Sequence, residues 1–193
     1  MKKIIGITGG TGCGKTTVLN VLQEMGFHII DCDRVYHRLL EEDARMLRAI
    51  DDRFPGVVEE GKLQRKKLGR VVFSNAEALD TLNKTVWPFV YKAVQEEIVC
   101  TGEPCAIDAI GLFESGLSDL CTHTVAVTAP REARIRRLMA RDSITEEYAA
   151  LRIDAQKDNE YFAARCDLIL ENHFSVEEDL RRYTAQMLKE TIL

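Results

Sequence analysis

A glycine-rich stretch directly after a short apolar run constrains this chain more than any other segment. Residues 9–16 read Gly-Gly-Thr-Gly-Cys-Gly-Lys-Thr, which matches the phosphate-binding pattern G-x-x-x-x-G-K-[ST] without a substitution. Glycines let the backbone curl around a phosphate group so that several N–H groups point inward. The pattern predicts that Lys15 reaches the β- and γ-phosphates of a nucleotide and that the Thr16 hydroxyl binds Mg²⁺. Unless the match is an accidental glycine-rich turn, the segment binds a nucleotide.

The segments around this loop predict an α/β fold. Residues 4–8 and 27–30 resemble short buried strands, and residues 16–25 between them carry apolar side chains at helical spacing. Asp31 and Asp33 follow the second strand. Because ligands bind at the carboxyl ends of strands in open parallel sheets, either carboxylate can face the loop. We expect one of them to cap the next helix and Asp33 to be the one that acts on a phosphate acceptor.

The rest of the chain predicts three more strands and one helical insertion. The strands are expected at residues 104–110, 124–129 and 167–172. Residues 43–103 read as mostly helical and separate the second strand from the third. Pro88 lies in the longest helical stretch of this insertion, and we expect the helix to bend or break there because proline has no N–H to donate.

Three further residues, two of them in or after the third strand and one in the insertion, allow more than one interpretation. Asp108 interrupts an apolar run, and a buried carboxylate needs a partner such as a metal-bound water, a lysine or a hydroxyl. A cap at the end of the strand is the alternative. Glu114 contacts substrate or forms a salt bridge, and Trp87 in the insertion packs in the core or lines an apolar wall beside the substrate.

Arg134, Arg137 and Arg141 recur at helical spacing, which places them on one face of a helix. A row of charges is usually a solvated face. A row that leads into a polar loop is also the way a lid brings positive charge onto a transferring phosphoryl group.

The composition is typical of a soluble globular protein. The 26 Lys and Arg and 31 Asp and Glu residues give a net charge of −5, which argues against a general nucleic-acid surface. Neither a signal peptide nor a transmembrane run is expected, and no obligate protein partner is evident, so the predicted location is the cytoplasm.

The six cysteines lack zinc spacings and read as small reduced thiols. Cys13 is the exception, because a thiol at a helix N-terminus can have a lowered pKa and can react with alkylating agents.

Taken together, these motifs resemble those of the dephospho-coenzyme A kinase family over nearly the full length of the chain. The resemblance rests on residues 5–17, on Ile30-Asp31-Cys32-Asp33, on Leu112-Phe113-Glu114, on Arg137 with Arg141-Asp142, on Arg152 with Ala155-Gln156, and on Ala164-Arg165 before a strand that ends in Asn172. The phosphate loop alone is shared by many kinases, whereas the whole series is specific.

The resemblance implies a P-loop kinase fold, in which a five-stranded parallel sheet lies between helices and carries a helical substrate-binding insertion and a lid. The implied parts of this single domain are a core of residues 1–42, 104–140 and 166–193, an insertion of residues 43–103 and a lid of residues 141–165. The implied reaction transfers the γ-phosphoryl group of ATP to the 3′-hydroxyl of dephospho-CoA, with Mg²⁺, and gives coenzyme A.

The family's functional residues map onto three groups in this sequence. The catalytic group is Asp33, Lys15, Arg137 and Arg141; the nucleotide-binding group is Gly9, Thr11, Gly12, Cys13, Gly14, Lys15, Thr16, Thr17 and Asn172; the metal group is Thr16 and Asp108. In this scheme Asp33 orients the 3′-hydroxyl and accepts its proton. The sequence departs from the family where Trp87-Pro88 replaces the usual His-Pro, and also at Ala109-Ile110-Gly111 and Leu170-Glu171-Asn172.

Three other classes of protein share parts of this pattern. A shikimate-type or nucleoside-monophosphate-type kinase also has the loop, but Gly9-Gly10 is the single Gly-Gly pair and the shikimate-type substrate loops are missing. A GTP-driven switch needs an N-K-x-D pattern, whereas Asn83-Lys84 is followed by Thr85-Val86. A nucleotide sensor without catalysis is the third alternative, and Asp33 and the arginine row argue against it.

Overall fold

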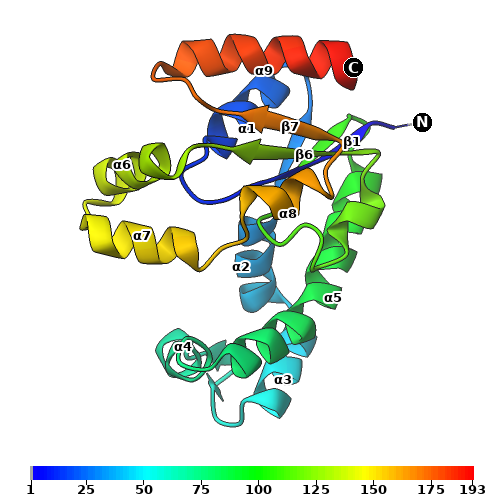
Figure 1. Cartoon of the computed structure of the whole chain (residues 1–193). Coiled ribbons are helices and arrows are strands. Elements are labelled where there is room, and N and C mark those ends of the chain that lie inside the picture. Colours follow the sequence, from blue (N-terminus) through cyan, green and yellow to red (C-terminus); the bar gives the residue numbers. More distant parts are fainter. Residues whose placement is uncertain (1) are drawn as a thin grey trace.

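A five-stranded parallel sheet forms the centre of the computed structural model, which describes residues 2–193 (Figure 1). The strands lie in the order β2-β5-β1-β6-β7. Their bounds are Ile4–Thr8 for β1, His28–Asp31 for β2, Cys105–Asp108 for β5, His123–Thr128 for β6 and Leu168–Glu171 for β7. All five strands that the sequence predicts are therefore confirmed. The third ends at Asp108 rather than running on to Ile110, so Asp108 lies at the ligand-binding edge of the sheet.

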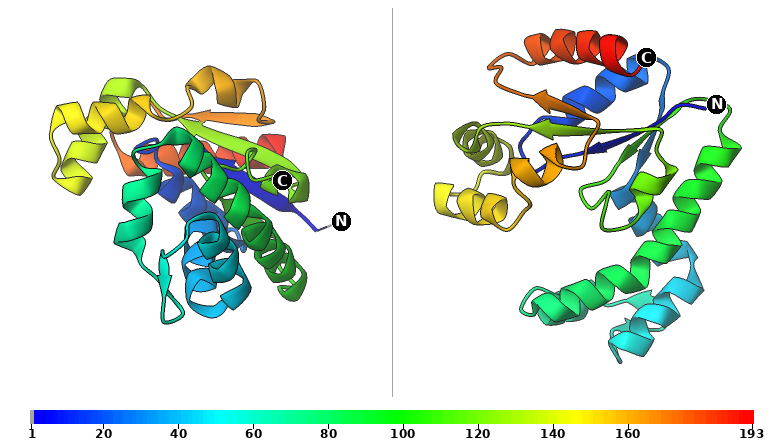
Figure 2. Two further views of the ribbon diagram at one scale, coloured as in Figure 1. Left: turned by 90° about the horizontal axis from the view of Figure 1, so that it is seen from below. Right: turned by 45° about the vertical axis from the view of Figure 1, so that its right-hand side comes forward.

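Helices cover both faces of this sheet (Figures 1 and 2). On one face, α1 (Lys15–Glu24) and the C-terminal α9 (Glu177–Thr191) bury Val18 and Leu188 against strand residues such as Ile7. On the other face, α2 (Cys32–Glu42) and α5 (Ala76–Cys100) bury Val35 and Val94 against Ile107. Because successive residues of a strand point to opposite faces, β1, β2 and β5 contribute to both cores, whereas β6 and β7 contribute to the core under α1 and α9.

The insertion forms a smaller body with a core of its own. It contains α3 (Ala44–Arg53), a hairpin of β3 (Val58–Glu59) and β4 (Lys62–Leu63), α4 (Arg65–Val72) and the first half of α5. The sequence indicated the helices but not the paired strands, which Glu60 and Gly61 connect in a turn. Both turn residues have positive φ, 50° and 73°, which suits a tight hairpin connection.

Helix α5 connects the insertion to the sheet. It runs through Pro88 without interruption, so the alternative of a break is wrong, while its axis changes direction along its length (Figures 1 and 2). Leu82 and Val86 before the proline pack in the insertion, and Val94 and Ile98 after it pack against the sheet. One helix thus fixes the position of the insertion relative to the strand ends.

The predicted lid residues lie in the segment that connects β6 to β7. Helix α6 (Arg131–Asp142) leaves β6, and α7 (Glu146–Asp154) packs against it through Leu138 and Ile153. A short α8 (Asn159–Ala163) leads back to β7, and a 3-10 turn, η1 (Leu117–Leu120), precedes β6. Within residues 2–193, no helix combines the length and apolar character needed to cross a membrane.

Candidate active site

The phosphate loop, residues 9–16, connects β1 to α1 with a backbone that two of its glycines make possible. Gly9 has a φ of +132°, and a Cβ atom there would lie 2.2 Å from the Val127 carbonyl oxygen. Gly14 is the N-cap of α1 with a φ of +103°, a conformation that other residues rarely adopt. The first residue of the helix is Lys15. The positive end of the α1 dipole therefore faces the space that the loop surrounds.

Side chains hold four carbonyl groups of the loop. The bonds are Lys15 Nζ to Gly9 O at 2.8 Å, Arg134 Nε to Thr11 O at 2.9 Å, Arg137 Nη1 to Gly12 O at 3.2 Å and Asn172 Nδ2 to Cys13 O at 2.8 Å. In a trans peptide the N–H points away from the C=O of the same unit. The bonds to these carbonyl groups therefore hold the N–H groups of the same peptide units in the opposite direction. N–H groups held in this way can bind an anion.

Lys15 and Asp108 lie together at the mouth of the loop. Burial lowers the pKa of the Lys15 ammonium, and the negative charges of Asp108 and Asp33 act in the opposite direction. Burial raises the pKa of the Asp108 carboxyl, which Lys15 lowers and which Asp31, its register partner on β2, raises further. Lys15 and Asp108 thus influence each other through their charges, which favours the ionised form of both groups against the effect of burial.

The two aspartates after β2 have different tasks. Asp31 caps α2, because its carboxylate accepts hydrogen bonds from the backbone N–H groups of Asp33 at 3.0 Å and Arg34 at 3.1 Å. Asp33 lies in the first turn of α2 with an exposed side chain that has no hydrogen-bond partner among residues 2–193. The helix begins at Cys32, slightly earlier than expected. The prediction that one of the two aspartates caps the next helix is confirmed, and the action of Asp33 on an acceptor stays a prediction.

A cavity of about 460 Å³, here called the phosphate cavity, lies in front of the loop. Its lining residues are Gly10, Thr11, Gly12, Gly14, Lys15, Thr16, Asp33, Asp108, Ile110, Arg137, Leu138, Arg141 and Arg152. The structure therefore brings most of the predicted site residues to one space. Four cationic side chains and two carboxylates face it, a composition suited to a polyanion and a hydroxyl acceptor.

The expected row of three arginines divides into separate roles. Arg134 is 5 % exposed and lies behind the loop, where its Nη2 also donates to Gln156 Oε1 at 2.9 Å. Gln156 Oε1 in turn accepts from the Thr11 N–H at 2.8 Å. Arg137 bridges the loop and the Phe174 carbonyl at 3.0 Å. The interpretation of one row of arginines that faces solvent or substrate is thus wrong for Arg134. Its spacing matches that of Arg137 and Arg141, but its side chain is buried.

Arg141 and Arg152 share one carboxylate at the edge of the cavity. Arg141 Nε donates to Asp142 Oδ1 at 2.7 Å, and Arg152 Nη1 donates to Asp142 Oδ2 at 2.6 Å. The pair holds the pKa of the Asp142 carboxyl well below its usual range. Asp142 therefore joins α6 to α7 and keeps two guanidinium groups side by side at the rim.

Three predicted nucleotide ligands have side chains that support the loop from outside the cavity. The Asn172 side chain is engaged by the loop and by the Phe174 N–H, at 3.3 Å from Oδ1. The Thr17 hydroxyl donates to Glu177 Oε1 at 3.1 Å. Cys13 is 1 % exposed and burial raises the pKa of its thiol, so the expectation of a lowered pKa is wrong. The helix dipole is outweighed because the sulfur is packed in the core rather than facing solvent.

Oxygen atoms suited to a magnesium ion meet at the same place. Thr16 and Asp108 both line the phosphate cavity, and hard oxygen ligands are what Mg²⁺ prefers. Within residues 2–193, no group of three or more His, Cys, Asp or Glu side chains is arranged to hold a metal. Because Mg²⁺ commonly uses one or two protein ligands together with water and substrate phosphates, this sparse pair fits the ion.

A second cavity of about 300 Å³, here called the apolar pocket, shares Asp33 and Ile110 with the phosphate cavity. Its other lining residues are Cys32, Tyr36, Leu82, Asn83, Val86, Trp87, Val90, Ala109, Gly111, Ser115 and Leu117. Trp87 therefore lines a wall beside Asp33 in addition to packing in the insertion. No motif in the sequence marks Asn83 as a site residue, although its i, i+4 spacing to Trp87 places both on one helix face.

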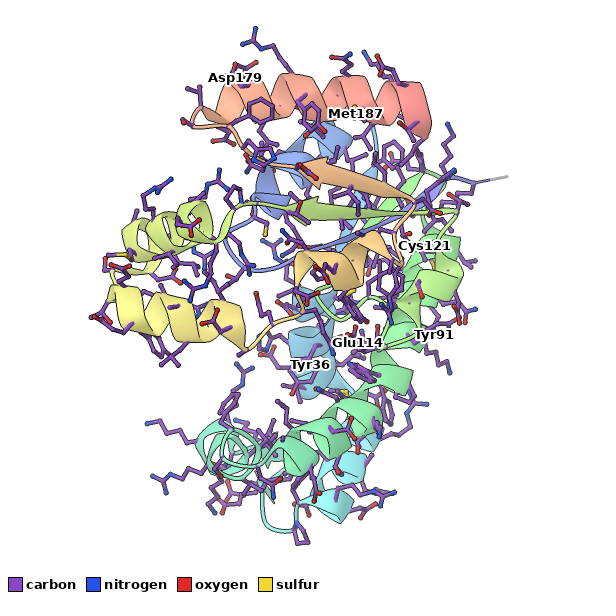
Figure 3. The ribbon with its side chains drawn as sticks, in the orientation of Figure 1. Tyr36, Tyr91, Glu114, Cys121, Asp179 and Met187 are labelled. Atoms are coloured by element: carbon purple, nitrogen blue, oxygen red, sulfur yellow. The ribbon has the colours of Figure 1, made fainter. Side chains whose placement is uncertain are left out.

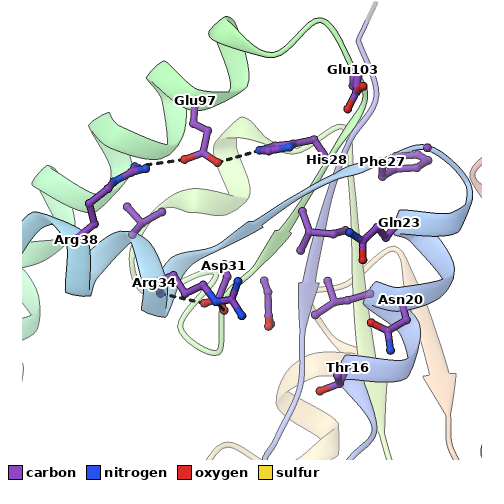
Figure 4. A pocket seen from close by; sticks show the side chains of 15 residues that line it. Thr16, Asn20, Gln23, Phe27, His28, Asp31, Arg34, Arg38, Glu97 and Glu103 are labelled. Carbon is purple, nitrogen blue, oxygen red and sulfur yellow. Dashed lines mark hydrogen bonds and ion pairs between the residues drawn. The ribbon is translucent and has the colours of Figure 1, made fainter.

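Glu114 and His28 lie outside the phosphate cavity. Glu114, labelled in Figure 3, accepts a hydrogen bond from the Tyr161 hydroxyl of α8 at 2.9 Å and so connects the loop after β5 to the lid side. His28 and Arg38 both contact Glu97, at 2.9 Å and 3.3 Å, in a cavity of about 900 Å³ along the outer strand β2 (Figure 4).

Comparison with known proteins links this arrangement to a family. A model of the family described as Dephospho-CoA kinase matches residues 3–178. A dephospho-CoA kinase of Carboxydothermus hydrogenoformans is 36 % identical over 180 residues, which cover 90 % of this chain and 87 % of that protein. A crystal structure from Thermus thermophilus, 37 % identical, superposes with a TM-score of 0.78 over 98 % of this chain and 97 % of its own. A shikimate kinase of Bacteroides thetaiotaomicron, 16 % identical, matches with a TM-score of 0.61 over the full length of both chains, which shows a shared P-loop kinase fold alone.

Proposed function

The chain belongs to the dephospho-CoA kinase family, and from the geometry of the phosphate cavity we propose which residues perform the family's reaction. The protein is a phosphotransferase that uses ATP to phosphorylate the 3′-hydroxyl of dephospho-CoA, the last step of coenzyme A synthesis. The observation that carries the proposal is that Asp33, a carboxylate without a hydrogen-bond partner among residues 2–193, lines the same cavity as the phosphate loop and Lys15.

The loop side of the cavity holds the nucleotide in this scheme. The N–H groups of the loop surround the β-phosphate, except that of Thr11, which donates to Gln156. Lys15 moves from the Gly9 carbonyl onto the β- and γ-phosphates. Thr16 and Asp108 hold Mg²⁺, which neutralises phosphate charge when bound. Cys13 and Thr17 contribute backbone N–H groups, since their side chains are buried, and Asn172 contributes by fixing the Cys13 carbonyl.

Asp33 acts on the acceptor side. Its carboxylate has no competing partner, so it can accept a hydrogen bond from the 3′-hydroxyl and orient the oxygen toward the γ-phosphorus. The oxygen attacks in line, the bond from the γ-phosphorus to the leaving oxygen of ADP breaks, and Asp33 takes the proton. Asp31 cannot serve in its place, because its oxygens hold the start of α2.

Arginines supply the positive charge that the moving phosphoryl group requires. Arg137, Arg141 and Arg152 line the same cavity as Asp33, and all three belong to α6 and α7. Their guanidinium groups stabilise the oxygens of the γ-phosphoryl group as charge redistributes in the transition state. We propose that Arg137 and Arg141 provide most of this effect. The bonds of Asp142 with Arg141 and Arg152 hold α6 and α7 together beside the cavity.

We further propose that the enzyme works in the cytoplasm. We also propose that its single domain consists of the core, the insertion and the lid with the boundaries stated above. Reduced surroundings suit its six free cysteines, and its net negative charge gives no support to nucleic-acid binding. Dephospho-CoA and ATP suffice as partners for the reaction described.

An acceptor panel tests the assignment. The protein is incubated with Mg-ATP and dephospho-CoA, shikimate or nucleoside monophosphates in turn, and a further sample receives GTP in place of ATP. Coenzyme A is expected from dephospho-CoA, with little transfer to the other acceptors. Efficient phosphorylation of shikimate or a nucleoside monophosphate, together with none of dephospho-CoA, would contradict it.

A further inference from the structure

The apolar pocket and the phosphate cavity meet at Asp33, but their walls differ in character. The phosphate cavity is lined by charged groups and glycine backbone, whereas the apolar pocket is lined mainly by aliphatic and aromatic side chains. Asp33 therefore stands at a boundary where one side suits phosphate and the other suits a flat apolar group.

Two aromatic side chains and one amide give the apolar pocket its specificity. Trp87 of α5 and Tyr36 of α2 are half-buried and contribute flat surfaces from two helices. Asn83 lies one helical turn before Trp87, and its side-chain amide has no hydrogen-bond partner among residues 2–193. The Ser115 hydroxyl, another polar group of the lining, already donates to the Gly111 carbonyl at 2.7 Å. Asn83 is thus an amide, beside the Asp33 carboxylate and the Tyr36 hydroxyl, that is left to recognise a ligand.

We propose that this pocket binds the adenine ring of dephospho-CoA, with Trp87 stacking on the purine and Asn83 hydrogen-bonding to its edge. The inference rests on the proposed role of Asp33 at the 3′-hydroxyl. Because the base is attached to the same ribose ring, it must lie close to Asp33, and the apolar pocket is the neighbouring space that suits it. A purine has apolar faces that stack on tryptophan and a donor–acceptor edge that asparagine can bind bidentately.

The pantetheine arm suits this pocket less well. The arm is a flexible chain with two amide groups and a thiol, and its burial requires several polar partners. The pocket offers one free amide and a volume of about 300 Å³, near the lower end for small-molecule sites. The arm leaves the ribose from its 5′ side and is expected to lie outside the pocket.

The chain carries its own reporter for this proposal, since Trp87 is its one tryptophan. The full-length enzyme is saturated with ADP to fill the nucleotide site and titrated with dephospho-CoA while tryptophan fluorescence is recorded. Stacking of the purine is expected to quench the emission in a saturable way, whereas 4′-phosphopantetheine, which lacks adenosine, is expected to leave it unchanged. Quenching by phosphopantetheine to the same extent would assign the pocket to the arm and overturn the proposal.

Variants test the same contacts by kinetics. Trp87→Ala is expected to raise the KM for dephospho-CoA roughly 10- to 100-fold with little change in the KM for ATP, and Trp87→Phe to restore much of the loss. Asn83→Ala is expected to raise the same KM by a smaller factor. Phe73→Ala is the matched control, because Phe73 is an 84 % exposed aromatic of the same insertion outside the pocket.

The outcomes separate this proposal from the proposed function. If wild-type enzyme forms coenzyme A but dephospho-CoA leaves the fluorescence unchanged, the adenine assignment fails and the function stands. If no coenzyme A forms, the function itself fails. Circular dichroism of each variant shows whether it folds, and Trp87→Phe provides the decisive kinetics if Trp87→Ala does not.

Discussion

The two sides of the phosphate cavity are built in different ways. On the nucleotide side, the residues that would touch phosphate are consecutive, and distant side chains such as Arg134 and Asn172 serve to hold their carbonyl groups. On the acceptor side, Asp33 and Ile110 follow the neighbouring strands β2 and β5, and Trp87 comes from α5, which packs against both the insertion and the sheet. The nucleotide side is thus a local sequence motif that distant side chains hold in place, whereas the acceptor side depends on tertiary packing. Four predictions test this contrast.

The largest effect is expected on the nucleotide side. Lys15→Ala removes the cation that is aimed at the phosphates, and kcat/KM for ATP should fall by roughly 10³-fold or more. Steady-state kinetics and nucleotide-binding titrations measure both parts of the loss. Lys92→Ala, on the exposed face of α5, is the control. Unchanged ATP affinity and rate in Lys15→Ala would remove the loop from the mechanism.

Asp33→Asn should separate the two sides. The variant keeps the shape of the acceptor side and the affinity for ATP but loses the base, so kcat is expected to drop by roughly 10²–10⁴-fold. Rapid-quench assays with dephospho-CoA give the rate, and equilibrium titration gives the ATP affinity. A rate near that of the wild type would show that Asp33 does not accept the proton.

The supports of the loop are expected to matter less than the loop itself. Arg134→Ala leaves the Thr11 carbonyl and the Gln156 oxygen without their buried donor, which should cost about 1–3 kcal/mol in the free energy of unfolding and raise the KM for ATP. Thermal unfolding should show a loss of several degrees. Arg136→Ala, an exposed neighbour on the same helix, should change neither property. Equal effects of the two substitutions would refute the supporting role.

The smallest effect concerns the insertion that carries the acceptor side. Asp43 caps α3, and its bonds with Arg45 lower the pKa of its carboxyl from 3.8 to about 2. A lowered pKa adds stability above the unfolded-state value and loses it as the pH falls toward 2. Asp43→Ala should therefore cost about 1 kcal/mol near neutral pH, and the difference from the wild type should shrink in acid. Urea unfolding across this range measures it, and a difference that does not depend on pH would count against the capping carboxylate.

The same contrast explains how much could be predicted from the sequence. Residues 9–16 follow one continuous pattern, and the alternation of strands and helices then orders the five strands along the chain. Asp31 and Asp33 could be assigned different tasks because a helix start needs one acceptor. Periodicity could not show that Arg134 points behind the loop while Arg137 lines the cavity, since helical spacing gives a face but not what lies opposite it.

The thiol of Cys13 shows a second limit. Its place at a helix N-terminus indicated a lowered pKa, whereas the packing of β1, β6 and α1 around it produces the opposite shift. Asn83 shows a third limit. Its meaning depends on the distance between α5 and the end of β5, which follows from packing rather than from sequence spacing.

The most direct test of the account is the stoichiometry of the reaction. Wild-type enzyme is given Mg-ATP and dephospho-CoA, and ADP and coenzyme A are quantified over the same time course. If the loop and Asp33 share one cavity as partners in transfer, the two products form in equal amounts and ADP formation nearly stops without the acceptor. ADP that forms at the same rate with or without dephospho-CoA, and without coenzyme A, would contradict the claim that the two sides act together.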